Sequence, residues 1–568
     1  MAERAPGCRA AAAGTAALLL LVLAAGVTSF VRRDPAPTPV DAPLRFEDVA
    51  ASVGLGEFRN GAFRDAVSAD PVATMGTGLC WLDADRDGWL DLYVVNTWAA
   101  AELGAWRAAG GPPRAALFRN DHGTFVDVSA GSGADLAIRG TGCAAADLDR
   151  DGDTDLVVGA AGNPALLWND GDGTFTEGAR AAGIRAYGWY TGVAIGDVNG
   201  DGWQDVFLAG YADLNRPVPT AVGGFPRTFA GVRDLLYVSD GLRDGGVAFR
   251  EVGPDVGLES PFPAHGLGAT FGDLDGDGDL DLVVANDLDP NALYENVAWP
   301  GGAAADPLGL GFRLDEIAAP AGVADPNAGM GVAVDDVNRD GYADLFVTNA
   351  RLQGHATYLG TDPSRADLAF APFPIGDPAM TASTGFGVSF GDLDRDGFPD
   401  ALLVSGEVPV TDLAADAEPI LFLRNLADAA DPGFVDASAS VGLDATPAVV
   451  ARGSAVADFD NDGDLDVAIA TVGGPLVLLR ASGGDAGWLE VAPWPATPGT
   501  RVTVSVGGRE QTCEVRAGSS YQSSEDPRCL FGLGGAGLRP TVTVVWPDGR
   551  SRTLRDVVAE RILRVGGV

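Results

Sequence analysis

The sequence predicts an all-β protein: a seven-bladed β-propeller followed by a small C-terminal β-sandwich domain. Three observations support this prediction. An Asp-rich string recurs seven times, each copy lies between two apolar strand-like runs, and the string stops before the last part of the chain. Glycine supplies 79 of the 568 residues, roughly double its usual share, as expected of many short strands joined by turns.

The N-terminal residues 1–30 are predicted to be a secretory signal peptide or a membrane anchor. Arg4 and Arg9 precede an apolar, Ala- and Leu-rich stretch that ends in small residues, as in signal peptides. The same stretch is long enough to span a bilayer, so the anchor remains an alternative. Residues 31–43 form a Pro-rich linker. In both cases we expect the rest of the chain to be extracellular, periplasmic or on the cell surface.

The repeat has the form D-x-[DN]-x-D-G-x-x-D, recurs at intervals of 50 to 76 residues, and is followed each time by an apolar strand. These intervals suit a four-stranded propeller blade with variable loops. The repeats predict a propeller over residues 44–485. The seven copies start at Asp83, Asp147, Asp197, Asp273, Asp336, Asp392 and Asp458.

The ends of the array predict how the ring closes. Residues 46–49 look like a fourth strand with no unit in front of them. The seventh unit has strand patterns at 452–457, 466–470 and 476–480 but stops before a fourth. We therefore expect the N-terminal strand to complete the last blade, because an open array would expose strand edges.

The spacing within the repeat is typical of a calcium loop. Oxygen ligands at positions 1, 3 and 5, a glycine at position 6 for the turn, a carbonyl at position 7 and an Asp at position 9 surround one point. Hard oxygen ligands favour Ca²⁺ over softer metals. The candidate ligands are Asp83, Asp85, Asp87, Trp89 and Asp91; Asp147, Asp149, Asp151, Asp153 and Asp155; Asp197, Asn199, Asp201, Trp203 and Asp205; Asp273, Asp275, Asp277, Asp279 and Asp281; Asp336, Asn338, Asp340, Tyr342 and Asp344; Asp392, Asp394, Asp396, Phe398 and Asp400; and Asp458, Asp460, Asp462, Asp464 and Asp466.

We expect up to seven Ca²⁺ ions with a structural role. Position 12 is apolar in every copy, which excludes EF-hands. The loops concentrate acidic side chains in a chain of net charge -41, and such clusters repel without a cation. Ca²⁺ at ten times its dissociation constant adds about 1.4 kcal/mol per site, on the order of 10 kcal/mol over seven sites.

These motifs resemble the FG-GAP/VCBS repeats of integrin α-chains and of many secreted bacterial proteins, over residues 44–485. The C-terminal residues 486–568 resemble an ASPIC/UnbV domain, through Gly499-Thr500-Arg501-Val502, Gly518-Ser519-Ser520-Tyr521-Gln522-Ser523 and Val545-Trp546-Pro547-Asp548-Gly549. The combination is similar to the cartilage acidic protein family and its bacterial relatives. The resemblance implies an extracellular calcium-binding protein, with adhesion or matrix contacts in animal members.

Several other features leave alternatives open. The close pair Cys513 and Cys529 is the better disulfide candidate, whereas Cys80 and Cys143 are either bonded or buried free thiols. The polar segment 519–524 is either a structured turn or a ligand loop. The aromatic residues in the long insertions 98–114 and 211–234 are either an adhesive patch or local packing.

The favoured function is a non-catalytic binding or adhesion module for an extracellular protein or polysaccharide. The alternatives are an accessory factor of a biosynthetic or surface pathway and a calcium-dependent hydrolase or lyase. The G-x-S-x-G match around Ser389 is a repeat strand, not a nucleophile elbow. The three histidines, His122, His265 and His355, have no evident nucleophile partner, and His265 is the one to test. The acidic charge argues against nucleic acid, and we expect a monomer with membrane contact only through an uncleaved N-terminal segment.

Overall fold

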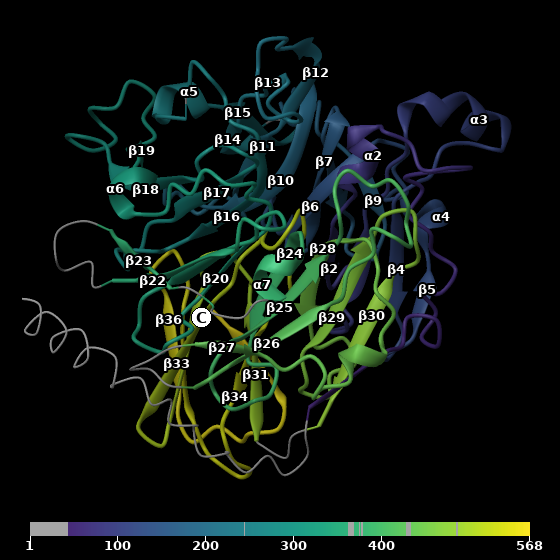
Figure 1. Cartoon of the computed structure of the whole chain (residues 1–568). Coiled ribbons are helices and arrows are strands. Elements are labelled where there is room, and N and C mark those ends of the chain that lie inside the picture. The colour runs from purple at the N-terminus through teal and green to yellow at the C-terminus, as the bar shows by residue number, and fades with distance from the viewer. Residues whose placement is uncertain are drawn as a thin grey trace, which may run out of the picture. The chain divides into compact units, whose positions relative to one another are not determined.

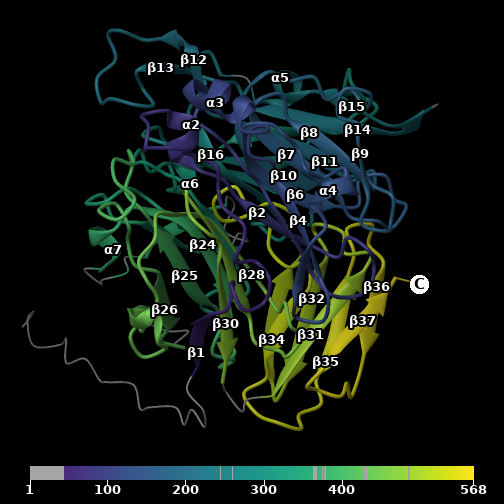
Figure 2. The same cartoon turned by 90° about the vertical axis from the view of Figure 1, so that its right-hand side faces the viewer.

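The computed structural model describes residues 44–243, 245–258, 260–361, 368–373, 375, 379–427, 433–483 and 487–567. The predicted signal peptide or anchor and the linker lie outside the described residues. Within the described part no helix is long and apolar enough to cross a bilayer. The predicted all-β fold, a propeller followed by a second β domain, is confirmed (Figures 1 and 2).

The propeller consists of consecutive four-stranded antiparallel units, each with its Asp-rich loop between the first and second strands. The first strand of a unit is buried on both faces, as in the first, second and fourth units. The units, in chain order, are β2(Leu79–Leu82), β3(Asp91–Val94), β4(Ala116–Asn120) and β5(Phe125–Asp127); β6(Gly140–Ala146), β7(Asp155–Gly162), β8(Ala165–Asn169) and β9(Phe175–Glu177); β10(Gly188–Gly196), β11(Asp205–Gly210), β14(Leu235–Arg243) and β15(Gly246–Glu251); β16(Gly266–Gly272), β17(Asp281–Asn286), β18(Ala292–Ala298) and β19(Phe312–Glu316); β20(Val332–Asp335), β21(Asp344–Val347), β22(Ala356–Gly360) and β23(Phe370–Pro372); β24(Gly385–Gly391), β25(Asp400–Ser405), β26(Leu421–Asn425) and β27(Phe434–Asp436); and β28(Ala451–Ala457), β29(Asp466–Thr471), β30(Val477–Ser482) and β1(Arg45–Asp48).

Two of these units share one eight-stranded sheet, so a strict count of seven separate blades stays a prediction. The long strands β7 and β10 run beyond their own units and pair with each other, Gly188 with Gly162 and Trp189 with Ala161. The merger accompanies the length of these strands, since β7 has 8 residues and β10 has 9.

The N-terminal strand completes the last unit, as predicted. β1 pairs antiparallel with β30, with Phe46 opposite Ala481. The last unit also shares a core with the first: Trp81 and Leu92 pack with Phe459. The Trp81 Nε1–H group donates to Ala455 O at 3.2 Å across this seam. Consecutive units share buried clusters in the same way around the array.

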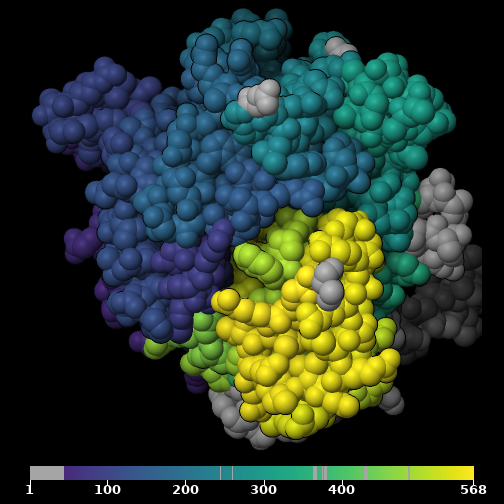
Figure 3. All heavy atoms as spheres, turned by 180° about the vertical axis from the view of Figure 1, so that it is seen from behind, coloured from purple at the N-terminus to yellow at the C-terminus, as the bar shows by residue number. Residues whose placement is uncertain are grey.

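The C-terminal domain is a two-sheet sandwich. Its core joins Leu489, Val504, Phe531 and Val544 from both sheets. By its contacts it forms one compact unit with the propeller, Asp41–Val568, and Figure 3 shows it in yellow against the purple, blue and teal units. The sheets are β31(Trp488–Trp494) with β34(Cys529–Gly532) and β37(Ile562–Gly566), and β32(Arg501–Val506) with β33(Arg509–Glu514), β35(Thr541–Val545) and β36(Ser551–Leu554).

Helices are short and lie in the connections. The insertion 211–234 contains a two-stranded ribbon, β12(Ala212–Pro217) and β13(Phe229–Gly231). Insertion 98–114 contains the η1 and α3 helices. The helical segments are α2(Pro71–Met75), η1(Ala100–Glu102), α3(Leu103–Ala108), α4(Ser129–Ser132), α5(Gly253–Val256), α6(Ala318–Ala321), α7(Ala379–Ala382) and η3(Leu443–Ala445).

Two disulfides are present. Cys513 bonds to Cys529, as the sequence favoured, with a Cα–Cα distance of 6.0 Å. Of the two alternatives for Cys80 and Cys143, the bonded state is the one observed, and the bond joins β2 of the first unit to β6 of the second.

The closing strand gives a first prediction. Replacing the buried Phe46 with Ala removes its packing against Phe422, whose ring centroid lies 6.0 Å away. We expect a loss of about 3–5 kcal/mol in the free energy of unfolding, measured by urea denaturation. The neighbouring Glu47, which points to solvent, supplies the control: Glu47→Ala should change stability by less than about 0.5 kcal/mol. Equal effects of the two substitutions would contradict a closed seam.

Candidate metal-binding loops

The seven Asp-rich loops share one backbone shape. Positions 4 and 6 have positive φ in each of them, for example 60° at Arg86 and 90° at Gly88. The glycine at position 6 adopts this conformation without steric cost, whereas the residue at position 4 is held in the left-handed region. Two consecutive turns result. In three loops the side chains of positions 1, 3 and 5 then converge, and in two others those of positions 1, 3 and 9 do.

The carboxylates of several loops converge. In five loops, three carboxylate oxygens lie within 4.8 Å of one another. The main chain sets this arrangement: the Gly88 N–H donates to Asp83 at 3.0 Å, and the Trp89 N–H donates to Asp87 at 2.8 Å. The converging sets are Asp83, Asp85 and Asp87; Asp147, Asp149 and Asp155; Asp273, Asp275 and Asp277; Asp392, Asp394 and Asp396; and Asp458, Asp460 and Asp466.

The converging oxygens fit a hard cation. Asp83 Oδ1, Asp85 Oδ1 and Asp147 Oδ1 are buried and have no hydrogen-bond partner among the described residues. Burial raises the pKa of Asp83 to about 6, and the charge of Asp87 adds to the shift. A set of desolvated oxygens that repel one another and accept no N–H group is the donor set that Ca²⁺ prefers.

The two loops with Asn at position 3 differ. Here the Asn199 Nδ2 amide donates to Asp201 Oδ2 at 3.1 Å, and the Asn338 amide donates to Asp340 at 3.0 Å. One repulsive carboxylate is replaced by a donor, so these loops carry less uncompensated charge. Positions 1 and 9 of both loops remain as in the others.

The Asp at position 9 has a second role that the ligand pattern did not reveal. Asp155 accepts the Leu148 N–H at 2.9 Å with one oxygen and the Asn169 N–H at 2.9 Å with the other. Burial raises the pKa of Asp155 to about 8, and the two N–H groups oppose the shift. Asp155 therefore ties the loop to the third strand of its own unit. The same pair of bonds occurs at Asp91, Asp205, Asp281, Asp344 and Asp466. At Asp400 the loop donor is instead the Asp394 N–H, at 3.3 Å, and the third-strand donor is the Asn425 N–H.

A recurring asparagine links neighbouring units. The Asn169 amide group donates to Thr154 O of its own loop and to Ala84 O of the preceding loop, both at 3.0 Å. The side chain is buried, so both bonds form away from water, where the loss of a partner is costly. Its sequence signal was the L-x-x-N pattern before the fourth strand. Asn120, Asn296 and Asn425 make the equivalent pairs of bonds.

Position 7 carries different side chains with local partners. Trp89 packs on His122 with ring centroids 4.8 Å apart, and Trp203 lies under the Arg150 guanidinium at 5.2 Å. Asp464 pairs with Arg395, which holds position 4 of the preceding loop, at 3.1 Å. Asp153 pairs with Arg86 in the same way. The predicted role of the position 7 carbonyl as a ligand stays a prediction.

The remaining candidate residues have structural contacts. His265 Nδ1 lies 2.6 Å from Asp289 and its Nε2 lies 3.2 Å from Phe229 O, so both ring nitrogens are engaged. His355 accepts the Asn349 N–H at 2.9 Å. Ser389 is buried in strand β24, which confirms that the G-x-S-x-G match is a repeat strand.

The aromatic residues of insertion 211–234 resolve as local packing. Phe225 contacts Trp189 and Tyr211 with ring centroids 6.3 and 5.8 Å away, and Phe229 packs on Phe225. The segment 519–524 is a structured turn, but it is buried among the inner strands of the propeller and not at the edge of its own domain.

Fold and loops together define a β-propeller module of FG-GAP-like repeats followed by an ASPIC/UnbV-type domain. Residues 147–208 match the family profile described as FG-GAP-like repeat, and residues 492–566 match the one described as ASPIC and UnbV. Both resemblances seen in the sequence are confirmed.

The chain is homologous to cartilage acidic protein 1. It is 25% identical to the Mus musculus protein over 504 residues, 74% of this chain and 72% of that one. It is 25% identical to the Homo sapiens protein over 373 residues, 63% of this chain, and spans about half the length of that relative. A solved Agrocybe aegerita lectin that recognises non-reducing terminal N-acetylglucosamine is 16% identical with a TM-score of 0.36, covering 65% of this chain and 88% of the lectin chain. That likeness is too distant to bear on the ligand.

The bonds of Asp155 give a prediction. Asp155→Ala leaves the Leu148 and Asn169 N–H groups buried without acceptors, at about 1–3 kcal/mol each. We expect a fall of about 2–5 kcal/mol in the free energy of unfolding in urea, whether calcium or chelator is present. The exposed Asp170 supplies the matched control, since Asp170→Ala should be nearly silent. A loss that appears only in calcium would assign Asp155 to the metal alone.

Proposed function

We propose that the chain is an extracellular, non-catalytic binding module whose propeller is stabilised by Ca²⁺ in the Asp-rich loops. The single observation that carries the calcium assignment is the convergence of three carboxylate oxygens in each of five loops. Several of these oxygens are buried and have no hydrogen-bond partner in the part of the chain that the structure describes. Asp83, Asp85 and Asp87 would hold the ion in the first loop. The ion would neutralise charges that otherwise repel across a few ångströms.

The partner we propose is an extracellular protein or polysaccharide. Homology to cartilage acidic protein 1 and the two exported-type disulfides support an extracellular setting. A propeller displays its specificity on loops of unequal length, and this chain has two long insertions, 98–114 and 211–234. A hydrolase or lyase would need a polar cluster at the mouth of the ring, where this chain places its own residues 517–524.

Calcium binding predicts a large effect on thermal stability. We expect millimolar Ca²⁺ to raise the unfolding temperature of the folded chain by more than ten degrees over EGTA, because several sites contribute about 1.4 kcal/mol each. Mg²⁺ at the same concentration should act weakly, since it requires a tighter octahedral shell. Differential scanning calorimetry measures this directly. Identical curves in calcium and EGTA would reject the structural role of the metal.

Terbium, which replaces calcium at oxygen sites, tests individual loops. Trp89 and Trp203 hold position 7 of two loops, so bound Tb³⁺ should emit on tryptophan excitation. We expect Trp89→Phe to remove the part of the emission that comes from the first loop, and Asp83→Asn to remove the same part with the tryptophan still present. Trp106→Phe, in α3 away from the Asp-rich strings, is the control. Emission that neither Trp89→Phe nor Asp83→Asn reduces would place the ion outside the first loop.

A further inference from the structure

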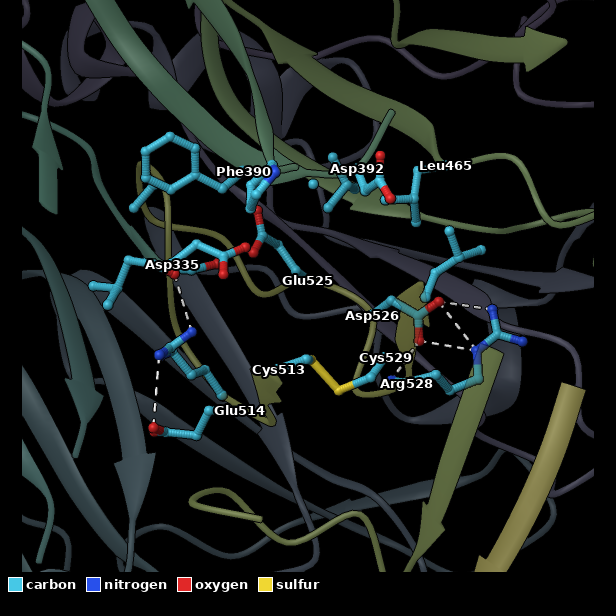
Figure 4. Close-up of a pocket in the computed structure, with 18 of the residues that line it drawn as sticks. Asp335, Phe390, Asp392, Leu465, Cys513, Glu514, Glu525, Asp526, Arg528 and Cys529 are labelled. Atoms are coloured by element: carbon cyan, nitrogen blue, oxygen red, sulfur yellow. Dashed lines mark hydrogen bonds and ion pairs between the residues drawn. A yellow bond between two sulfur atoms is a disulfide. The ribbon is translucent and has the colours of Figure 1, made fainter. Parts of the chain in front are cut away.

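A disulfide-closed loop of the C-terminal domain enters the propeller. Its base is the Cys513–Cys529 bond between strands β33 and β34, and it spans residues 514–528, here called the axial loop. Figure 4 shows this bond with Glu514 on one side and Asp526 and Arg528 on the other. Because the bond joins the two ends, the loop loses less conformational entropy on insertion than an open segment of equal length.

The tip of the axial loop is a tight hairpin. The Ser519 N–H donates to Ser523 O at 2.9 Å, and the Ser523 N–H donates to Ser519 O at 3.3 Å. Ser520 and Gln522 have φ of 54° and 57°, in the left-handed region that non-glycine residues avoid. Such a conformation persists when the surroundings fix it, and here the surroundings are the propeller.

The tip is bound by the inner strands of the propeller through the main chain. Ser520 exchanges two hydrogen bonds with Val332 of β20, at 2.7 and 3.0 Å. Ser524 pairs with Cys80 of β2, and Ala517 O accepts the Ile195 N–H of β10 at 2.8 Å. Two other inner strands donate to the tip, through the Cys143 N–H to Gln522 O and the Val388 N–H to Ser520 Oγ. The Ser454 and Ser520 hydroxyls share a hydrogen bond, and a Cβ at Gly268 would lie 3.2 Å from Ser520 O.

The loop reaches through to the opposite side of the inner strands. Tyr521 is fully buried, packs edge-on against Phe386 at 4.9 Å, and donates from its hydroxyl to Met75 O of α2 at 3.0 Å. The buried Arg452 guanidinium stacks on the same Phe386 ring at 3.8 Å and also donates to α2, at Thr74 O. Tyr521 therefore links the C-terminal domain to the helix on the far side.

Glycines in the inner strands leave room for the loop. A Cβ at Gly78 would lie 1.7 Å from Gln522 O, and its nearest neighbours all belong to the axial loop. A Cβ at Gly453 would meet Ser523 Oγ at 2.6 Å. Any side chain at Gly78 would therefore collide with the main chain of the axial loop.

The C-terminal domain contacts the Asp-rich loops around the base of the axial loop through ion pairs and hydrogen bonds. Arg528 is almost fully buried and donates to Asp458 O and Asn461 Oδ1 of the seventh loop, both at 2.7 Å. Arg501 pairs with Asp273 of the fourth loop at 2.7 Å. The Gly532 N–H donates to Asp392 of the sixth loop at 2.9 Å. An Arg-bearing domain thus lies on the acidic loops of the propeller.

We propose that the propeller axis is a peptide-binding site whose ligand is the chain's own axial loop. The site recognises a hairpin of small polar residues through main-chain hydrogen bonds, with Tyr521 as its buried anchor. The C-terminal domain is then a bound partner of the propeller, held by this interface independently of the covalent connection. While the loop is in place, an external ligand is confined to the outer loops and insertions.

The test separates the covalent connection from the interface. A specific protease site is inserted between Ser482 and Trp488 of the folded full chain, which is then cut in saturating calcium. We expect the two fragments to remain together in size-exclusion chromatography and to separate slowly on dilution. Gly78→Ala, which obstructs only the axial loop, should speed separation at least tenfold. If the two fragments of the cut chain without further substitutions separate at once, the proposal is wrong.

A second pair of variants keeps the test decisive if Gly78→Ala folds poorly. Tyr521→Phe retains the ring and removes the bond to Met75, so separation should quicken about three- to tenfold. Gln522→Met is the matched control, because the Gln522 amide is buried and has no partner among the described residues. Gly104, with open space around it, gives the glycine control, Gly104→Ala. Equal rates for Tyr521→Phe and Gln522→Met would refute the anchoring role. Calcium is saturating throughout, so the result does not depend on the metal assignment.

Discussion

The propeller depends on one buried carboxylate per unit, the Asp at position 9 of each loop. It lies at the start of the second strand, where solvent is excluded, and its oxygens accept N–H groups of the main chain. Through Asp155 the loop, the second strand and the third strand of one unit meet at a single side chain. Asn169, whose N–H donates to Asp155, also donates from its side-chain amide to Ala84 O in the loop of the previous unit. A unit therefore cannot shift its loop without breaking contacts in two units.

Local patterns predict the architecture because they are repeated. Seven copies of one string at blade-like intervals indicate both the fold and the loop chemistry, and the unmatched strand at Phe46 indicates the closure. The structure adds what a ligand pattern cannot contain: Asp155 serves the main chain as well as the loop centre, and Asn169 reaches a carbonyl of another unit. These roles depend on positions in space that the spacing of one repeat does not encode.

The axial loop was beyond sequence reasoning for a physical reason. Segment 519–524 contains four serines, which are typical of exposed turns, yet Ser520 and Tyr521 are fully buried. Their burial is acceptable because the propeller supplies main-chain partners more than a hundred residues away in sequence. Separation along the sequence, here 63 residues, is also why the sequence alone leaves the bond between Cys80 and Cys143 open; the bond joins two inner strands beside the loop. Serine side chains, which in a sequence suggest a turn, are here small enough to fit between the inner strands of the propeller.

The pairing of β1 with β30 also sets the order in which the molecule can be assembled. The first strand of the described chain finds its place only after the last strand of the propeller exists, and the axial loop follows later still. Contacts between residues hundreds of positions apart must form before the ring is shut, and such long-range contacts slow folding. Until then the N-terminal strand and the edge of β30 stay unpaired and open to other chains. The edges of β1 and β30 therefore stay exposed for a long time during folding, until the two strands pair.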